Sequence, residues 1–175
     1  MTQIKIYLFV ILLTHSLFTS SAFAQNAKAI NDVACKALDK KYFTDENGIV
    51  KLYGIRTNDA DTRYGKWACA KVATIILQKA GAIKEIMLGV GRVEELLRHW
   101  KKIEDESSLK PGDVIVWVNR FSGRKDGKCT GGGNCHIGIV TKKGYFHNSP
   151  ASRVPTFDGA SLWAFKFKIG YRPPE

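Results

Sequence analysis

A cysteine and a histidine that lie far apart in the sequence form the candidate chemical centre of this chain. Cys69 stands in the first turn of WACAKVATIILQKAG, whose apolar residues recur at helical spacing, and His136 opens the strand-like run HIGIV. A thiol at a helix N-terminus faces unpaired backbone N–H groups, which favour the thiolate. One helix end lowers a thiol pKa by less than about one unit, so Cys69 needs a histidine as its base.

The strand that His136 opens determines which groups face it. His136, Gly138 and Val140 share one face of this strand, and Ile137 and Ile139 share the other. With both isoleucines buried, we expect the imidazole on the opposite face, where the helix that carries the thiol would lie.

A hairpin at 142–144 is expected to return the segment 145–147 beside this strand. His147 or Asn148 would then hold the second imidazole nitrogen of His136. A polar group in this position fixes the tautomer of the base and stabilises its protonated form. The residues alone leave both alternatives open.

The elements that position these residues are predicted from hydrophobic period and turn signals. Helices are expected at about 31–41, 65–82 and 93–102, with Gly81 where the second one ends. Strands are expected at 114–118, 136–141, 145–147 and 162–171. Because helices come first and hairpin-linked strands follow, the sequence predicts an α+β fold, with helices packed on a C-terminal antiparallel sheet.

The first 24 residues have the pattern of a signal peptide. Lys5 precedes an apolar run at 6–18, and Ala22-Phe23-Ala24 is a small-x-small cleavage motif. The run is shorter than the roughly 20 apolar residues that span a bilayer, so an uncleaved anchor is the weaker alternative. We therefore expect an exported protein, periplasmic or secreted, with a single domain at 25–175 and no membrane span in the mature chain.

The chain is strongly basic. Its formal net charge is +11, and loss of the leader removes Lys5 and leaves +10. This charge favours polyanions such as cell wall, nucleic acid or lipid head groups. The basic residues are spread along the chain without a block, so a merely solvated surface is an equal alternative.

Four cysteines remain after the leader, at positions 35, 69, 129 and 135. An oxidising compartment favours disulfides, and four cysteines allow three full pairings. A Cys129–Cys135 bond would brace the glycine loop before His136 and leave Cys69 a thiol. A bond from Cys35 to either loop cysteine is the alternative.

The order of WACAKVATIILQKAG, LKPGDVIVW, HIGIV and YFHNS resembles the NlpC-type and CHAP enzymes. This papain-like superfamily cuts peptide or amide bonds in bacterial peptidoglycan, and the resemblance covers about residues 53–154. It implies that Cys69 is the nucleophile, His136 the general base and acid, and His147 the orienting residue. In other branches the orienting residue is an asparagine, which matches Asn148.

The resemblance also implies a substrate, partners and a contact surface. Trp67, Tyr64 and Asn148 are the expected substrate contacts, and peptidoglycan or its fragments the expected ligand. An immunity or regulatory protein would be a further partner, whereas no nucleic acid, cofactor or metal is required. The chain departs from the NlpC pattern because Ala68-Cys69-Ala70-Lys71 replaces Asp-Cys-Ser-Gly, and because Tyr53 competes with Tyr64 for the upstream tyrosine.

Three other interpretations compete with the hydrolase. A zinc module would use Cys129, Cys135 and His136, with Cys69 or His147, but zinc sites normally bring two close pairs of ligands. A phosphate-binding loop is disfavoured because no Gly-Lys-Ser/Thr and no helix follow the glycines at 131–133. A basic protein that binds the wall or inhibits an enzyme without catalysis is the third alternative. We therefore predict an exported cysteine hydrolase.

Overall fold

The fold is taken from a computed structural model of the chain. It describes residues 26–121, 128–129, 134–158 and 162–174. The predicted leader at 1–24 and the glycines at 131–133 lie outside these residues. Within the described part of the chain, no helix is long and apolar enough to cross a membrane.

The strongest helical prediction is confirmed. Helix α2 (Cys69–Lys79) begins at the candidate nucleophile and buries an apolar face that includes Val72 and Ile76. Its end is closed by backbone bonds from Gly81 to Gln78 and from residue 82 to residue 77. Gly81 adopts a φ of +76° there, which suits a residue without Cβ. The helix therefore presents Cys69 at its N-terminal end.

The other two helices differ from their predicted bounds because tertiary contacts override local pattern. The first is helical at 26–36, and Asn31, which we expected at its start, is buried inside it and accepts a hydrogen bond from the Lys142 backbone. Helix α3 (Val90–Leu96) ends before the predicted 93–102 segment does. Residues 101–103 instead pair with the C-terminal strand.

The main sheet has six antiparallel strands in the order β4-β9-β5-β6-β7-β8. The predicted strands in this region are confirmed, except that the last one begins at residue 165 and not at 162. The register aligns Trp117 with His136 and Gly138 with His147. The strands are β4 (Lys101–Ile103), β5 (Val114–Asn119), β6 (Cys135–Thr141), β7 (Gly144–Asn148), β8 (Pro155–Phe157) and β9 (Phe165–Arg172).

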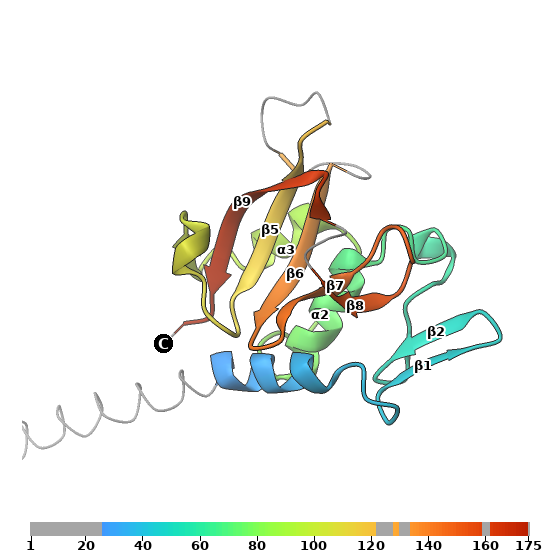
Figure 1. The fold of residues 1–175 in the computed structure, drawn as a ribbon. Helices are drawn as coiled ribbons and strands as arrows, with labels where there is room; N and C mark the ends of the chain where they lie inside the picture. Colours follow the sequence, from blue (N-terminus) through green and yellow to red (C-terminus); the bar gives the residue numbers. More distant parts are fainter. Residues whose placement is uncertain (1–25, 122–127, 130–133, 159–161, 175) are drawn as a thin grey trace, which may run out of the picture.

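A small three-stranded sheet, which was not predicted, lies between the first helix and α2 in the sequence, and Figure 1 shows it at one side of the molecule. Its strands are short, so their alternation is brief and does not stand out in the sequence. The turn between its first two strands consists of Asn47 and Gly48, both with positive φ. The strands are β1 (Phe43–Glu46), β2 (Ile49–Leu52) and β3 (Ile55–Arg56), and short 3-10 turns occupy Ala60–Thr62 and Glu106–Ser108.

The central strands are covered on both faces. Helix α2 packs on the face that carries Ile137 and Ile139, and Figure 1 shows α2 and α3 behind β5 and β6. Trp117 and Val140 lie in a second apolar cluster. His136 alternates with the isoleucines and contacts Trp117, so its ring is on the face opposite α2. The expectation that the helix lies on the His136 face is therefore wrong, because the β-branched face needs the apolar side of α2.

Candidate active site

The candidate nucleophile lies where α2 meets the start of β6. Cys69 is the first residue of the helix and is half-buried. Burial raises the pKa of its thiol to about 11, while the N–H groups of Ala70, Ile137 and Cys69 itself, which point at the sulfur, oppose this rise. Desolvation therefore outweighs the helix end, and the thiol is protonated near pH 7.

The candidate base is enclosed by aromatic rings. His136 is 2% exposed, and its ring centroid lies 5.2 Å from that of Phe165 and 5.7 Å from that of Trp117. Burial, together with the charge of the neighbouring His147, lowers the pKa of His136 to about 3, although the charge of Asp158 opposes both effects. The imidazole is therefore neutral near pH 7, the form that accepts a proton.

A chain of hydrogen bonds fixes which nitrogen of His136 accepts that proton. His147 Nε2 lies 3.0 Å from the main-chain oxygen of Asp158, and a carbonyl oxygen only accepts, so Nε2 carries the hydrogen. In the neutral ring, Nδ1 of His147 is then an acceptor, and it lies 3.0 Å from Nε2 of His136. His136 donates from Nε2, which leaves its Nδ1 as the basic nitrogen.

Cys69 and His136 line one cavity of about 440 Å³. Across the described residues no hydrogen bond joins the thiol to the imidazole, so the two groups meet only through this shared space. The arrangement brings together a protonated thiol, a neutral base with a free nitrogen, and helix N–H groups. A carbonyl group in the cavity would be next to all three, the set that acyl transfer requires.

The two alternatives for the orienting residue are separated in space. His147 is fully buried and contacts His136, whereas Asn148 points elsewhere and donates from Nδ2 to the carbonyl of Gly65, at 2.8 Å. Asn148 Oδ1 is buried without a partner among the described atoms. Asn148 thus ties the end of β7 to the segment that leads into α2.

The expected substrate contacts are only partly in the cavity. Trp67 lines it, and the guanidinium carbon of Arg63 lies 3.5 Å from the centre of the indole ring. Tyr64 is 64% exposed and is not among the described residues that line the cavity. Asn148 is also outside this lining, because its side chain is buried against the loop. Of the three residues, Trp67 is the one placed to contact a ligand.

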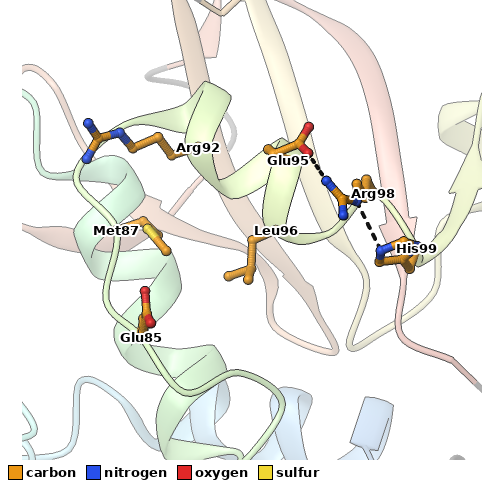
Figure 2. Close-up of a pocket in the computed structure, with 7 residues that line it drawn as sticks. All are labelled: Glu85, Met87, Arg92, Glu95, Leu96, Arg98 and His99. Atoms are coloured by element: carbon orange, nitrogen blue, oxygen red, sulfur yellow. Dashed lines mark hydrogen bonds and ion pairs between the residues drawn. The ribbon is translucent and has the colours of Figure 1, made fainter.

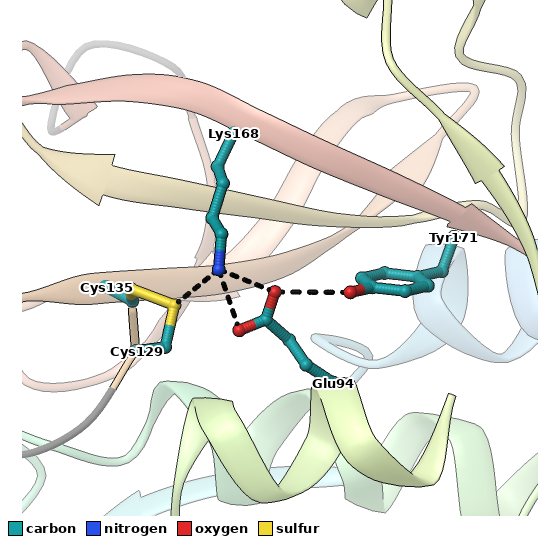
Figure 3. Close-up of a disulfide and its surroundings, with 5 residues drawn as sticks. All are labelled: Glu94, Cys129, Cys135, Lys168 and Tyr171. Atoms are coloured by element: carbon teal, nitrogen blue, oxygen red, sulfur yellow. Dashed lines mark hydrogen bonds and ion pairs between the residues drawn. A yellow bond between two sulfur atoms is a disulfide. The ribbon is translucent and has the colours of Figure 1, made fainter. Parts of the chain in front are cut away.

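A disulfide joins Cys129 to Cys135, the first residue of β6, and Cys35 and Cys69 are free. Figure 3 shows the ammonium of Lys168 between Cys129 Sγ, at 3.3 Å, and the carboxylate of Glu94, at 2.8 and 3.0 Å. This contact links the loop before His136 to β9 and α3. With the two sulfurs joined, neither loop cysteine has a thiolate for zinc, so the zinc interpretation loses two of its ligands.

Asp158 is the member of the site that the sequence reasoning missed. Its carboxylate oxygen Oδ1 lies 3.5 Å from His147 Nε2, in addition to the main-chain contact. It follows β8, which pairs with β7. Strand β8 has three residues and includes a proline, so no period in the sequence predicts it, and its register cannot be read.

A larger cavity, of about 580 Å³, lies between the 85–87 segment and α3, away from these residues (Figure 2). Three of its polar side chains contact one another, because Arg98 donates to both Glu95 and His99. The described lining contains neither cysteine nor serine. It therefore offers no nucleophile for acyl transfer.

Comparisons with known proteins leave the site to be interpreted from its own geometry. The sequence matches no protein-family model and no curated protein. Among solved structures, NlpC2 from Trichomonas vaginalis is similar, with a TM-score of 0.41 and 17% sequence identity. The similarity covers 61% of this chain and 37% of NlpC2, so the chain spans little more than a third of that protein.

Proposed function

We propose that the protein is an exported papain-like cysteine hydrolase that cleaves peptide or amide bonds in the stem peptides or cross-links of bacterial peptidoglycan. The observation that carries this proposal is the hydrogen-bond chain from Asp158 through His147 to His136, which leaves Nδ1 of His136 basic in a residue that lines the same cavity as Cys69. The sequence resemblance assigns the same roles to Cys69, His136 and His147.

The first half of the proposed reaction transfers the acyl group to the enzyme. Cys69 Sγ attacks the substrate carbonyl carbon while its proton passes to Nδ1 of His136. The oxyanion that forms is stabilised by the N–H groups of Cys69 and Ala70 at the start of α2. His136 then returns the proton to the leaving amine as the C–N bond breaks, which leaves a thioester on Cys69.

The second half uses the same base. His136 takes a proton from water as the water attacks the thioester, and Cys69 leaves and recovers a proton. In each half His136 is briefly an imidazolium. Its Nε2 donates to Nδ1 of His147, and the carboxylate of Asp158 stabilises the positive charge. This stabilisation is needed because the resting environment of His136 strongly disfavours its charge.

The mature chain, proposed as residues 25–175, has a charge that suits a wall substrate. A net charge of +10 after loss of the leader attracts the protein to an anionic wall, and this attraction weakens as salt rises. Periplasmic or secreted localisation and a regulatory or immunity partner belong to the same proposal.

The test is the release of defined fragments from purified, peptide-cross-linked sacculi. The mature protein is incubated with the sacculi, and soluble products are identified by mass spectrometry. We expect new free amino and carboxyl ends at one peptide bond, and none with Cys69→Ala. Products that carry new glycan ends, or no products from a wall of any cross-link type, would overturn the proposal.

A non-catalytic wall-binding protein is the second candidate, and the raised pKa of Cys69 favours it because no thiolate is present at rest. This candidate predicts equal pelleting of wild type and Cys69→Ala with sacculi, at low and high salt, and no fragments from either. The hydrolase predicts equal pelleting but fragments from wild type only. The two experiments together separate the candidates.

A further inference from the structure

We infer that Lys66 selects substrates that carry a free carboxylate close to the scissile bond, and disfavours the same substrates with that group amidated. This inference rests on the proposed function, since it concerns the specificity of the same cavity. It is carried by the charge of the cavity lining, by the anchoring of the Lys66 backbone and by the short chain distance from Lys66 to Cys69.

The lining has a single formal charge. Lys66 is the one charged side chain among the described residues around the cavity. In the described structure its ammonium has no hydrogen bond or ion pair, in contrast to Lys71, which pairs with Asp59. The remaining contacts offered to a ligand are largely apolar, from Trp67, Leu88, Val90, Pro150 and Phe165.

An unpaired cation beside an apolar wall favours an anionic group on an otherwise uncharged ligand. No described lining residue is acidic, so nothing in the cavity neutralises Lys66. Arg63, stacked on Trp67, adds a second positive charge next to the lining. A carboxylate gains from both charges, whereas a carboxamide of the same shape gains from neither.

The backbone of Lys66 is anchored on both sides. Before it, the carbonyl of Gly65 accepts a hydrogen bond from the buried Asn148, and Gly65 lies so close to Arg153 that an added Cβ would be 2.4 Å from its carbonyl oxygen. After it, the Trp67 N–H donates to the Thr62 carbonyl, at 2.9 Å. The backbone of Lys66 is therefore fixed, and the position of the ammonium changes only by rotation within the lysine side chain.

The distance to the nucleophile limits which substrate group Lys66 can contact. Only Trp67 and Ala68 lie between the two positions, so the Cα atoms of Lys66 and Cys69 are at most about 11 Å apart. An extended substrate covers about 3.3 Å per residue, so the carboxylate that the Lys66 side chain can contact lies within a few residues of the cleaved bond. Stem peptides with unamidated acidic residues fit this requirement.

Two small reagents test the charge without any need for turnover. Iodoacetate and iodoacetamide both alkylate a thiolate with loss of iodide, but iodoacetate carries a carboxylate where iodoacetamide carries an uncharged carboxamide. At pH 9 the alkylation rate of Cys69 by each reagent is measured by peptide mass spectrometry, which separates Cys69 from Cys35. The normalised ratio is the iodoacetate rate over the iodoacetamide rate at Cys69, divided by the same ratio for free cysteine. We expect Lys66→Gln to lower the normalised ratio by roughly three- to fivefold, the effect of one charge pair that involves an exposed lysine.

Lys79→Gln is the matched control, because Lys79 is exposed at the far end of α2, about 15 Å along the helix from Cys69. It removes the same charge and should leave the ratio unchanged. An unchanged ratio in Lys66→Gln, or an equal fall in both variants, overturns the inference. Because alkylation requires no hydrolysis, this result stands whether or not the protein proves to be a hydrolase.

Where the protein cleaves a peptide, a matched pair of substrates with carboxylate or carboxamide extends the test. We expect kcat/KM to favour the carboxylate in wild type and in Lys79→Gln, and the preference to fall by a similar factor in Lys66→Gln. Cleavage with no preference in wild type refutes Lys66 as the selecting residue while leaving the hydrolase proposal intact. If the alkylation ratio depends on Lys66 but no peptide is cleaved, the hydrolase proposal is refuted and the charge preference of Lys66 stands.

Discussion

Acidification from pH 6.5 to pH 5 should destabilise the folded protein through His136. A histidine in an unfolded chain has a pKa near 6.5, and burial holds the pKa of His136 at about 3 in the folded state. Between these values the unfolded state binds a proton that the folded state does not. The stabilisation is therefore complete above pH 6.5 and is lost as the pH falls, by about 1.4 kcal/mol per unit, or about 2 kcal/mol by pH 5.

The assay is urea unfolding at pH 7 and pH 5 of wild type, His136→Gln and His99→Gln. His99 is exposed beside Arg98 on the surface and serves as the matched histidine control. We expect wild type and His99→Gln to lose the same free energy of unfolding, and His136→Gln to lose about 2 kcal/mol less. An equal loss in all three proteins would refute a His136 that is held neutral by burial.

The remaining predictions concern the thiol, the carboxylate and the loop before α2. Near pH 7 Cys69 should react with iodoacetamide roughly two orders of magnitude more slowly than free cysteine, because the pKa of its thiol is about 11. The rate should rise with pH up to that value. A rate at pH 7 equal to that of free cysteine would contradict this prediction. Asp158→Asn should lower kcat about three- to tenfold with little change in Tm, because the His136 imidazolium loses a negative charge that stabilises it. An unchanged kcat would show that Asp158 does not stabilise the imidazolium. Gly65→Ala should lower the free energy of unfolding by more than about 2 kcal/mol, and Gly144→Ala by about 1 kcal/mol. Both glycines have positive φ, but only a Cβ at position 65 would meet a backbone oxygen, at 2.4 Å. Equal losses in urea unfolding would rule out that contact.

The sequence predicts those parts of the fold whose period is long or strong. Helix α2 repeats its apolar positions over eleven residues, and β5 and β6 are β-branched runs, so their existence and nearly their bounds follow from the pattern. The small N-terminal sheet is too short for such a signal. Strand β4 was predicted as the end of a helix because its local pattern suits a helix, and only pairing with β9 decides otherwise.

The site is predictable in residue type but not in arrangement. Alternation along β6 separates His136 from Ile137, yet it cannot say which face α2 covers, and we placed the helix on the wrong one. The spacing of the hairpin brings His147 to Gly138, which puts its ring beside His136. The position of Asp158 depends on the register between β7 and β8, which no sequence pattern predicts. Asn148 lies outside the cavity because its side chain donates to the carbonyl of Gly65 in the loop before α2.

The role of Cys69 as nucleophile is tested most directly by comparing the two free thiols, Cys69 and Cys35, in one reaction. Wild type, Cys69→Ala and Cys35→Ala are mixed with a soluble cross-linked muropeptide, quenched with acid during turnover and analysed by peptide mapping for an acyl adduct and for products. The proposed mechanism predicts products from wild type and Cys35→Ala, with any adduct on the peptide that contains Cys69. It predicts neither products nor adduct from Cys69→Ala. Product formation by Cys69→Ala, at any rate near that of wild type, would contradict it.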